Sequence, residues 1–198
     1  MARLRKFGPG LSRARRRIPK IEPNEASVVL AVTVGEHRSL LGADLEVCKD
    51  PGLGWAAIVE AADTEDAKHQ VFKVPHHASP TAHHDDVWNR MLMPQPWAAA
   101  TPFASGDVRL PSVSDCQRIL ARTRRAYLTA PPKPGKFHDP NRTVEKTVIE
   151  ATRSVHFVPG RYGHVRLRKQ IDAAADSDWH VALFGDATKM EDYVQRGR

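Results

Sequence analysis

The sequence predicts an α+β protein built on a mixed sheet with helices on its outer face. Short runs rich in Val and Leu alternate with segments of helical periodicity, which indicates strands and helices in turn. The runs Ser27–Val34 and His37–Leu41 are separated only by Gly35-Glu36, so they predict an antiparallel hairpin. The strand–helix–strand segments that follow predict parallel strands joined by right-handed crossovers.

The first half of the chain has the clearest patterns. Ser27–Val34 is almost entirely apolar and rich in β-branched residues, which is typical of a strand buried on both faces. His37 stands beside the turn, and we expect it at the surface. Gly54–Ala62 predicts a helix, because its large side chains recur at helical spacing and form one apolar stripe. Beyond it we expect a strand at Val71–Val74 and a helix at Asp85–Met93.

The second half is less regular. Ser114-Asp115-Cys116-Gln117 is interpreted as a capping box that opens a helix, with Cys116 in the core. Asp139-Pro140 is expected to open another helix, because proline is favoured in the first turn. That helix would bury Val144, Val148 and Ala151. The remaining strand candidates are Pro96–Phe103, Tyr127–Thr129, Val155–Val158, Val165–Leu167 and Val181–Phe184.

Two of the predicted strands end in side chains that can bind a metal or take part in catalysis. Leu40–Leu41 runs into Gly42-Ala43 and the carboxylate of Asp44, and Val71–Val74 runs into Pro75, His76 and His77. A strand end is stiff and holds an imidazole in a fixed direction, as a metal or catalytic site requires. The alternative is that Asp44 caps a turn and the histidines only bond to a loop.

Other histidines offer weaker candidates. His83-His84 precedes Asp85-Asp86 and is a possible second metal cluster, although an aspartate at a helix N-terminus is explained by capping and the helix dipole. His164 follows Gly163 and is expected to be a surface residue of a strand.

The order of these motifs resembles a known family. An Asn…Ser–Val–Leu strand at Asn24–Leu30, the Leu–Leu–Gly…Asp turn ending at Asp44, and Lys73-Val-Pro-His-His-Ala-Ser79 together resemble the C-terminal half of a metallo-β-lactamase-fold hydrolase. The nearest branch is the hydrolase domain of the DNA-uptake channel protein of competent bacteria. The sequence departs from that branch by an inserted Ala43 and by Ala78 in place of the usual glycine.

The resemblance implies half of an αββα sandwich, spanning residues 24–198, and a role in metal-dependent hydrolysis of a phosphodiester or a related ester. Asp44 and His76 would then be catalytic, and Asp44, His76 and His77 would bind metal, with Asp44 bridging two zinc ions. The family's other metal ligands lie in an HxHxDH motif, and the sequence of 198 residues contains no such motif. We therefore expect this chain alone to hold zinc weakly or not at all.

Three accounts stay open for such a chain. The ligand-rich half is carried by another polypeptide or encoded upstream, and the joint protein is a hydrolase. Alternatively, the chain is a degenerate, non-catalytic binding or scaffold module. In the third account, its basic N-terminus makes it a nucleic-acid-associated protein. Half a sandwich would expose the apolar inner face of its sheet, so we expect a partner, either an N-terminal-half protein or a second copy.

The net charge of +7 belongs to one end of the chain. Eight of the 30 Lys and Arg residues fall within the first twenty positions, together with no acid, and the rest carries 22 basic against 23 acidic residues. Glycine and proline interrupt this segment, so residues 1–23 predict a flexible basic arm. Such an arm can bind nucleic acid through phosphate contacts. The residues expected to do so are Arg13, Arg15, Arg16 and Arg17.

Composition also bears on the compartment. No apolar run approaches the roughly 20 residues that span a bilayer, so we expect no membrane association. The basic N-terminus lacks the apolar segment of a secretory signal. Cys48 and Cys116 are too few and too far apart for a disulfide framework. A reducing, cytoplasmic location is therefore expected.

Overall fold

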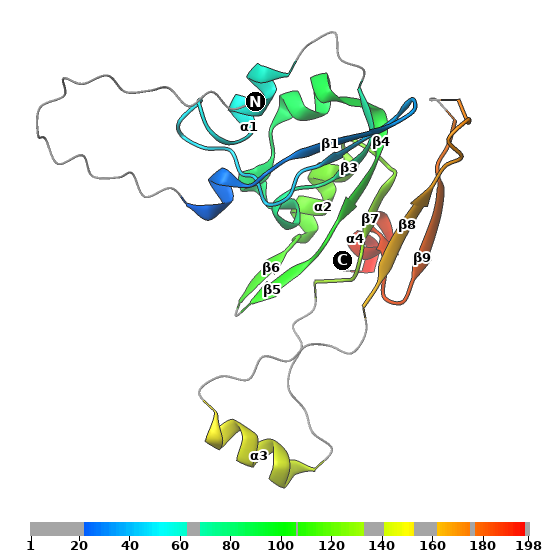
Figure 1. Ribbon diagram of the computed structural model, residues 1–198. Helices are drawn as coiled ribbons and strands as arrows, with labels where there is room; N and C mark the ends of the chain where they lie inside the picture. Colours follow the sequence, from blue (N-terminus) through cyan, green and yellow to red (C-terminus); the bar gives the residue numbers. More distant parts are fainter. Residues whose placement is uncertain are drawn as a thin grey trace, which may run out of the picture.

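The protein is an α+β domain built on a mixed six-stranded sheet, as the sequence predicts (Figure 1). The computed structural model describes residues 22–62, 68–105, 107–132, 141–152, 162–174 and 177–196. In the sheet the strand order is β1-β2-β3-β4-β7-β10, where β2, β3, β4 and β7 are parallel and both edge strands are antiparallel to their neighbours. The strands are β1 (Leu30–Val34), β2 (His37–Leu41), β3 (His69–Lys73), β4 (Leu92–Ala100), β7 (Ala126–Leu128) and β10 (Thr188–Lys189).

Two antiparallel hairpins stand outside this sheet. One is formed by β5 (Phe103–Ser105) and β6 (Val108–Leu110), and the other by β8 (His164–Arg168) and β9 (His180–Phe184). The helices are α1 (Gly54–Ala61), α2 (Val113–Leu120), α3 (Arg142–Ala151) and α4 (Met190–Arg196), with a π-helical segment at Val87–Met91 and 3₁₀ turns at Pro23–Ala26, His76–Ala78 and Pro80–Ala82. No helix among the described residues is long and apolar enough to cross a membrane.

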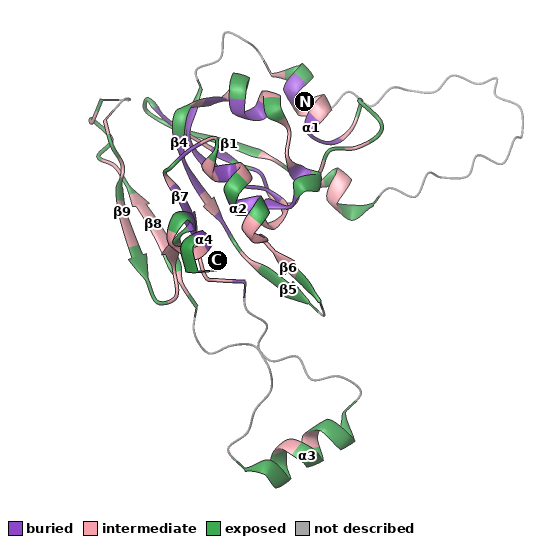
Figure 2. Ribbon diagram, turned by 180° about the vertical axis from the view of Figure 1, so that it is seen from behind, coloured by how far each residue is buried: buried purple, intermediate pink, exposed green. Residues whose placement is uncertain are grey.

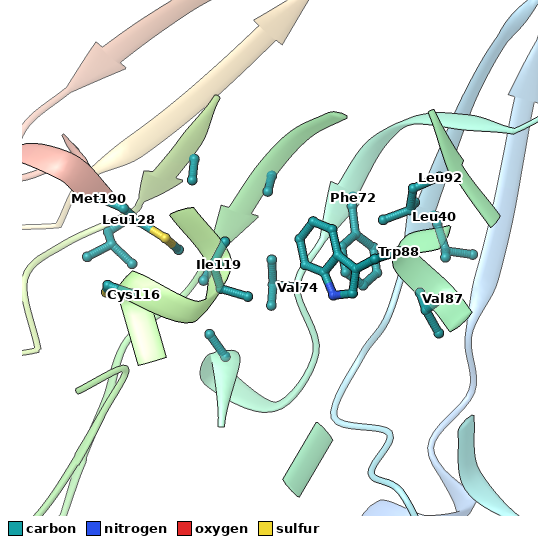
Figure 3. Close-up of a cluster of buried hydrophobic side chains, with 14 of the residues drawn as sticks. Leu40, Phe72, Val74, Val87, Trp88, Leu92, Cys116, Ile119, Leu128 and Met190 are labelled. Carbon is teal, nitrogen blue, oxygen red and sulfur yellow. The ribbon is translucent and has the colours of Figure 1, made fainter. Parts of the chain in front are cut away.

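The main core lies between the sheet and its helices (Figure 3). Phe72 of β3 is at its centre, with Trp88 edge-on at a ring-centroid distance of 5.2 Å and Trp55 edge-on at 6.3 Å. Trp55 belongs to α1 and Trp88 to the Val87–Met91 segment, so both cover the same face. This confirms the prediction that strands ending at Asp44 and Pro75 share one sheet and one helical layer.

A smaller core lies on the opposite face of the sheet. There the β8–β9 hairpin packs against Val71, Trp97 and Tyr127. The residues it contributes are Val165, Leu167, Trp179 and Val181. The hairpin therefore covers β3, β4 and β7 on the face that we expected to be exposed.

The strand β1 corrects one prediction. All five of its residues are exposed (Figure 2), so the strand is not buried on both faces. The reason is its position at the edge of the sheet, beyond the reach of the hairpin. Leu30, Val32 and Val34 point to the hairpin side, because they pair with residues of β2 whose side chains face that way. Their exposed fractions are 53%, 42% and 53%, so an apolar stripe remains open here.

Other local predictions also need correction. His37 is not a surface residue: it is buried, its Nε2 lies 2.9 Å from the carbonyl of Gln170, and its ring meets Trp179 edge-on. The capping box of α2 begins two residues earlier than expected. Ser112 is the N-cap, and the side chain of Asp115 accepts from its backbone N–H.

The helix α3 differs from its prediction as well. Its N-cap is Asn141, whose side chain accepts from the backbone of Thr143, and none of its residues is buried. Val144, Val148 and Ala151 therefore do not form a buried stripe within the described part of the chain. Asp139-Pro140, Val155–Val158 and the basic arm up to residue 21 lie outside the described residues.

Replacing Phe72 by alanine should lower the free energy of unfolding by about 3–5 kcal/mol, because it removes the ring that both Trp55 and Trp88 contact. The matched control is Phe103→Ala, at a ring that is 41% exposed, which should cost less than about 1 kcal/mol. Urea unfolding followed by circular dichroism measures both. Equal losses in the two variants would contradict the central position of Phe72.

Candidate functional site

The tips of β2 and β3 meet at one edge of the sheet. The two strands are parallel neighbours, so their carboxyl ends lie together. The backbone N–H of Gly42 donates to the carbonyl of Lys73 at 3.1 Å, and that of His76 donates to the carbonyl of Ala43 at 3.1 Å. The structure therefore joins the Asp44 turn and the His76–His77 turn through their backbones.

Close approach explains the glycine in this turn. A Cβ on Gly42 would lie 2.9 Å from Cβ of Pro75 and 3.0 Å from the carbonyl oxygen of Lys73. A real side chain does not tolerate contacts this short. Lys73 and Pro75 both belong to the segment that runs from the end of β3 into the His76–His77 turn. Any larger residue at Gly42 would push the two tips apart.

Backbone strain is concentrated at the same place. Ala43, His76, His77 and Ala78 all have positive φ, between 42° and 61°. Non-glycine residues in this left-handed region cost of order 1–3 kcal/mol each and persist only where surrounding contacts impose them. Such clusters are typical of functional sites. Outside these turns, the only other non-glycine residue with positive φ in the described chain is Gln95.

Arg118 of α2 is hydrogen-bonded to the strained turn. Its Nη2 donates to the carbonyl oxygen of Ala78 at 2.6 Å, while its Nη1 pairs with Asp115 at 2.9 Å. Asp115 is itself buried and fixed by the capping box at Ser112. The turn that carries the histidines is thus anchored to α2 through Arg118, which Asp115 in the first turn of that helix holds in place.

His76 has partners on both ring nitrogens. Its Nδ1 lies 2.6 Å from the carboxylate oxygen of Glu46, which also accepts a hydrogen bond from the hydroxyl of Thr81. Its Nε2 lies 3.4 Å from the amide nitrogen of Asn24. An amide nitrogen can only donate, so Nε2 accepts and Nδ1 carries the proton that is donated to Glu46.

His77 is oriented by a backbone carbonyl. Its Nδ1 lies 2.9 Å from the oxygen of Thr101, just after β4, and its ring packs against Phe103 at 5.2 Å. A carbonyl oxygen can only accept, so Nδ1 donates here too. Both histidines therefore present Nε2 as the nitrogen with a lone pair, which is the state of a metal-binding imidazole with an outer hydrogen-bond partner.

Asp44 sits beside a lysine rather than in an ion pair with the histidines. Burial lowers the pKa of Lys73, and the negative charge of Asp44 acts in the opposite direction. Lys73 donates through Nζ to the carbonyl oxygen of Ala43 at 3.1 Å. The Asp44 turn therefore holds a carboxylate near a half-buried ammonium group, at the edge where His76 and His77 lie.

Of the remaining histidine candidates, His83 and His84 lie beside the same turn and line a small pocket with Pro75, Ala78 and Arg118. His83 faces Asp85, with Nε2 3.3 Å from its carboxylate, and burial together with the charge of Arg118 lowers the pKa of His83. His84 accepts through Nδ1 from the backbone N–H of Asp86 at 3.2 Å. His164 is exposed on β8, as predicted.

Zinc prefers imidazole and carboxylate donors, which His76, His77 and Asp44 provide. Within the described ranges, however, no three His, Cys, Asp or Glu side chains are grouped closely enough to hold a metal ion. The donor types therefore suit zinc, but the described residues do not complete a coordination shell.

Sequence reasoning missed three residues of this site. Asn24 stood within a quoted motif and Glu46 follows another by two residues, and only their place around His76 gives them a role. Arg118 lies 40 residues from Ala78, and its one local signal was the i, i+3 spacing from Asp115. A long-range contact of this kind leaves no trace in periodicity.

Comparisons with protein families, with curated proteins and with solved structures find no match to this chain. The structure itself defines an α+β domain with a mixed six-stranded sheet.

The neutral rings of His77 and His84 should be in different tautomers. At a pH where imidazoles are neutral, His77 should carry its proton on Nδ1, because it donates to Thr101, whereas His84 should carry it on Nε2, because its Nδ1 accepts from Asp86. Long-range ¹H–¹⁵N spectra of the ring nitrogens distinguish the two forms. An Nε2–H tautomer at His77 would contradict the orientation derived above.

Proposed function

We propose that this chain is one half of a metal-dependent hydrolase of the metallo-β-lactamase fold, acting on a phosphodiester or a related ester. Asp44, His76 and His77 form its part of the metal shell, and a partner polypeptide with an HxHxDH motif supplies the rest. The observation that carries the proposal is the pair of histidines fixed through Nδ1 at one strand tip, beside Asp44.

The chemistry of the donors supports zinc as the cofactor. When bound, zinc supplies Lewis acidity toward the ester oxygens and toward a water molecule. The protein side chains contribute orientation: Glu46 holds the ring of His76, and the carbonyl of Thr101 holds that of His77. Fixing the ring and its tautomer in this way raises ligand basicity and removes the entropy cost of ordering the ligand.

One layer of the fold supports the assignment to half of an αββα sandwich. Helices cover one face of the mixed sheet, as in the outer layer of such a fold. The open stripe of Leu30, Val32 and Val34 on the other face offers the partner an apolar surface next to the hairpin. Sheet-on-sheet packing uses such faces.

A second candidate function is a non-catalytic binding or scaffold module of the same fold. It is favoured by Asn24, whose amide is directed at the very nitrogen of His76 that a metal would use. In that account the hydrogen bond has replaced the metal, and the strained turn serves only to hold the loop.

A Co²⁺ titration of the full chain separates the two functions. If the chain is a half-site, the ring signals of His76 and His77 should broaden at lower Co²⁺ concentrations than those of His83 and His84, because hydrogen bonds through Nδ1 fix both rings and leave a lone pair on Nε2. Asp44→Ala should raise the required concentration several-fold, and Asn24→Ala should lower it by freeing Nε2 of His76.

The His83-His84 pair is the internal control, since it has the same composition but different hydrogen bonds. Broadening that is equal at all histidines would leave only non-specific binding and would favour the non-catalytic module. The stoichiometry should stay well below one tightly held ion per chain, because three ligands at most leave the zinc shell open.

The hydrolase itself should appear on reconstitution. Co-expression with an HxHxDH polypeptide encoded beside this chain should give a complex that hydrolyses bis(p-nitrophenyl) phosphate in a Zn²⁺- or Mn²⁺-dependent way. Asp44→Ala should abolish turnover and leave the complex intact by size-exclusion chromatography, whereas Asp50→Ala, at an exposed carboxylate, should leave both unchanged. A stable complex with full activity in the Asp44→Ala variant would refute the assignment.

A further inference from the structure

His83 shares a pocket with Arg118, the side chain that is hydrogen-bonded to the strained turn. The pocket has a volume of about 10 Å³, roughly the space that one water molecule needs. The side chain of His83 is only 15% exposed. A charge on this ring would therefore lose most of its hydration. Most of the apolar wall of the pocket can be seen in Figure 3, where it consists of Phe72, Val74, Val87, Trp88 and Ile119.

The surroundings of His83 disfavour a positive charge on its ring. Burial is the largest cause that lowers the pKa of His83, and the charge of Arg118 is the next, whereas Asp85 acts in the opposite direction. The ring is therefore neutral at neutral pH. The charged and titratable groups around it are Asp85 and His84 on its own segment, Arg118 with its partner Asp115 on α2, and Arg122 just after α2, which pairs with Asp85.

A proton on this ring would add a second cation to the pocket. The Nε2 atom of neutral His83 donates to Asp85 at 3.3 Å, so Nδ1 is the nitrogen that takes up the proton. The new N–H would join the Nε of Arg118, which is already buried without an acceptor among the described residues. Two cations in one pocket with apolar walls disfavour each other.

Of these two cations, His83 is the one with the weaker hold on the pocket. Arg118 is paired with the buried carboxylate of Asp115 at 2.9 Å. The partner of His83 is Asp85, whose side chain is 67% exposed. Protonation should therefore move His83 out of the pocket toward solvent, together with its carboxylate partner.

The segment that would move with His83 is hydrogen-bonded to the candidate site. The backbone N–H of His83 donates at 3.2 Å to the first carbonyl of the 3₁₀ turn Pro80–Ala82. In the middle of that turn, the hydroxyl of Thr81 donates to Glu46 at 2.5 Å. Glu46 is the carboxylate that holds the ring of His76. One short turn and two hydrogen bonds thus connect His83 with His76.

We propose that His83 is a pH-dependent latch for the turn that carries His76 and His77. With a neutral ring, His83 stays in the pocket, and the turn keeps its hydrogen bonds to Glu46 and Arg118. With a protonated ring, His83 leaves the pocket and the turn loosens in weak acid. The consequence for a metal site rests on the proposed function, but the latch is a property of the free chain and is testable without metal.

The sign of the pH dependence follows from proton uptake. Burial and the charge of Arg118 keep the pKa of His83 low while the ring is in the pocket, and the ordinary pKa returns once the ring reaches solvent. Opening therefore takes up one proton. Between about pH 6.5 and the lower pKa of the closed form, the opening constant should rise about tenfold for each pH unit of acidification. At neutral pH the hydrogen bonds of the turn are fully present.

Amide hydrogen exchange of the full chain in EDTA, followed by NMR from neutral pH into weak acid, measures this opening. The reporters are the backbone N–H groups of Val47, Ala82 and His83, which donate to the carbonyls of Thr81, Ser79 and Pro80. Their protection factors should fall about tenfold per pH unit below the ordinary pKa of histidine. The N–H of Ala98, in the central strand β4, should stay protected and so exclude global unfolding.

Substitutions at His83 fix its charge. His83→Gln stays neutral, so the reporters should keep their protection in weak acid. His83→Lys is charged throughout, so at neutral pH it should already show the low protection that the wild type shows in acid. His83→Met is the matched control for the length of the lysine and should keep the turn closed. His84→Gln, at the other histidine of the pocket, should retain the pH dependence of the wild type.

Titration of the ring is a second measurement, and it needs no variant of His83 to fold. The ring C–H signals of His83 in the wild type should report a pKa below the ordinary value. Arg118→Met keeps most of the stem without the charge and should move that pKa upward, because it removes the cation from the pocket.

Three results would overturn the proposal. An unchanged pH dependence in His83→Gln would show that another group controls the turn. Full protection in His83→Lys at neutral pH would show that a charge at this position does not open it. A ring pKa of His83 at or above the ordinary value would remove the cause of opening. Because EDTA is present throughout, these results do not bear on the metal site, and a failed Co²⁺ titration would leave the latch intact.

Discussion

Phe72 is the side chain on which the arrangement of the helical layer depends. It projects from the central strand β3 and meets Trp55 and Trp88 edge-on, which come from the two connections on either side of that strand. Edge-to-face pairs of this kind add to the gain from burial. Because one ring contacts both connections, it fixes α1 and the Val87–Met91 segment on the same face. That arrangement brings β2, β3 and β4 out at one edge of the sheet in parallel.

The turns at this edge of the sheet have a strained backbone, and other contacts in the fold must offset its cost in free energy. The positive φ values at Ala43, His76, His77 and Ala78 are unfavourable locally. Backbone hydrogen bonds between the two tips and the guanidinium of Arg118 offset that cost. The result is a turn in which two imidazoles have few alternative positions. Side chains held in this way are what binding of a metal or a ligand requires.

The opposite face of the sheet is divided between two kinds of surface. The β8–β9 hairpin buries Val71, Trp97 and Tyr127, whereas the stripe on β1 stays apolar and open. An open apolar sheet edge suits packing against another protein. The hairpin and the stripe therefore divide one face of the sheet into a covered part and an open apolar part.

The sequence by itself determined the local elements and the position of the candidate site. Helical periodicity was sufficient for α1, the Gly35-Glu36 turn was sufficient for β2, and the apolar run Val71–Val74 was sufficient for β3, because these signals are set by neighbours in the chain. That the side chains of Asp44 and His76 stand just beyond the ends of those strands followed from adjacency in the chain alone. Tertiary structure decided which faces were covered: β1 has the composition of a buried strand but lies at an edge, and His37 is buried only because Gln170 and Trp179 reach it from more than 130 residues away. It also placed Asn24, Glu46 and Arg118 around the histidine turn, since contacts between distant segments depend on packing and leave no periodic signal.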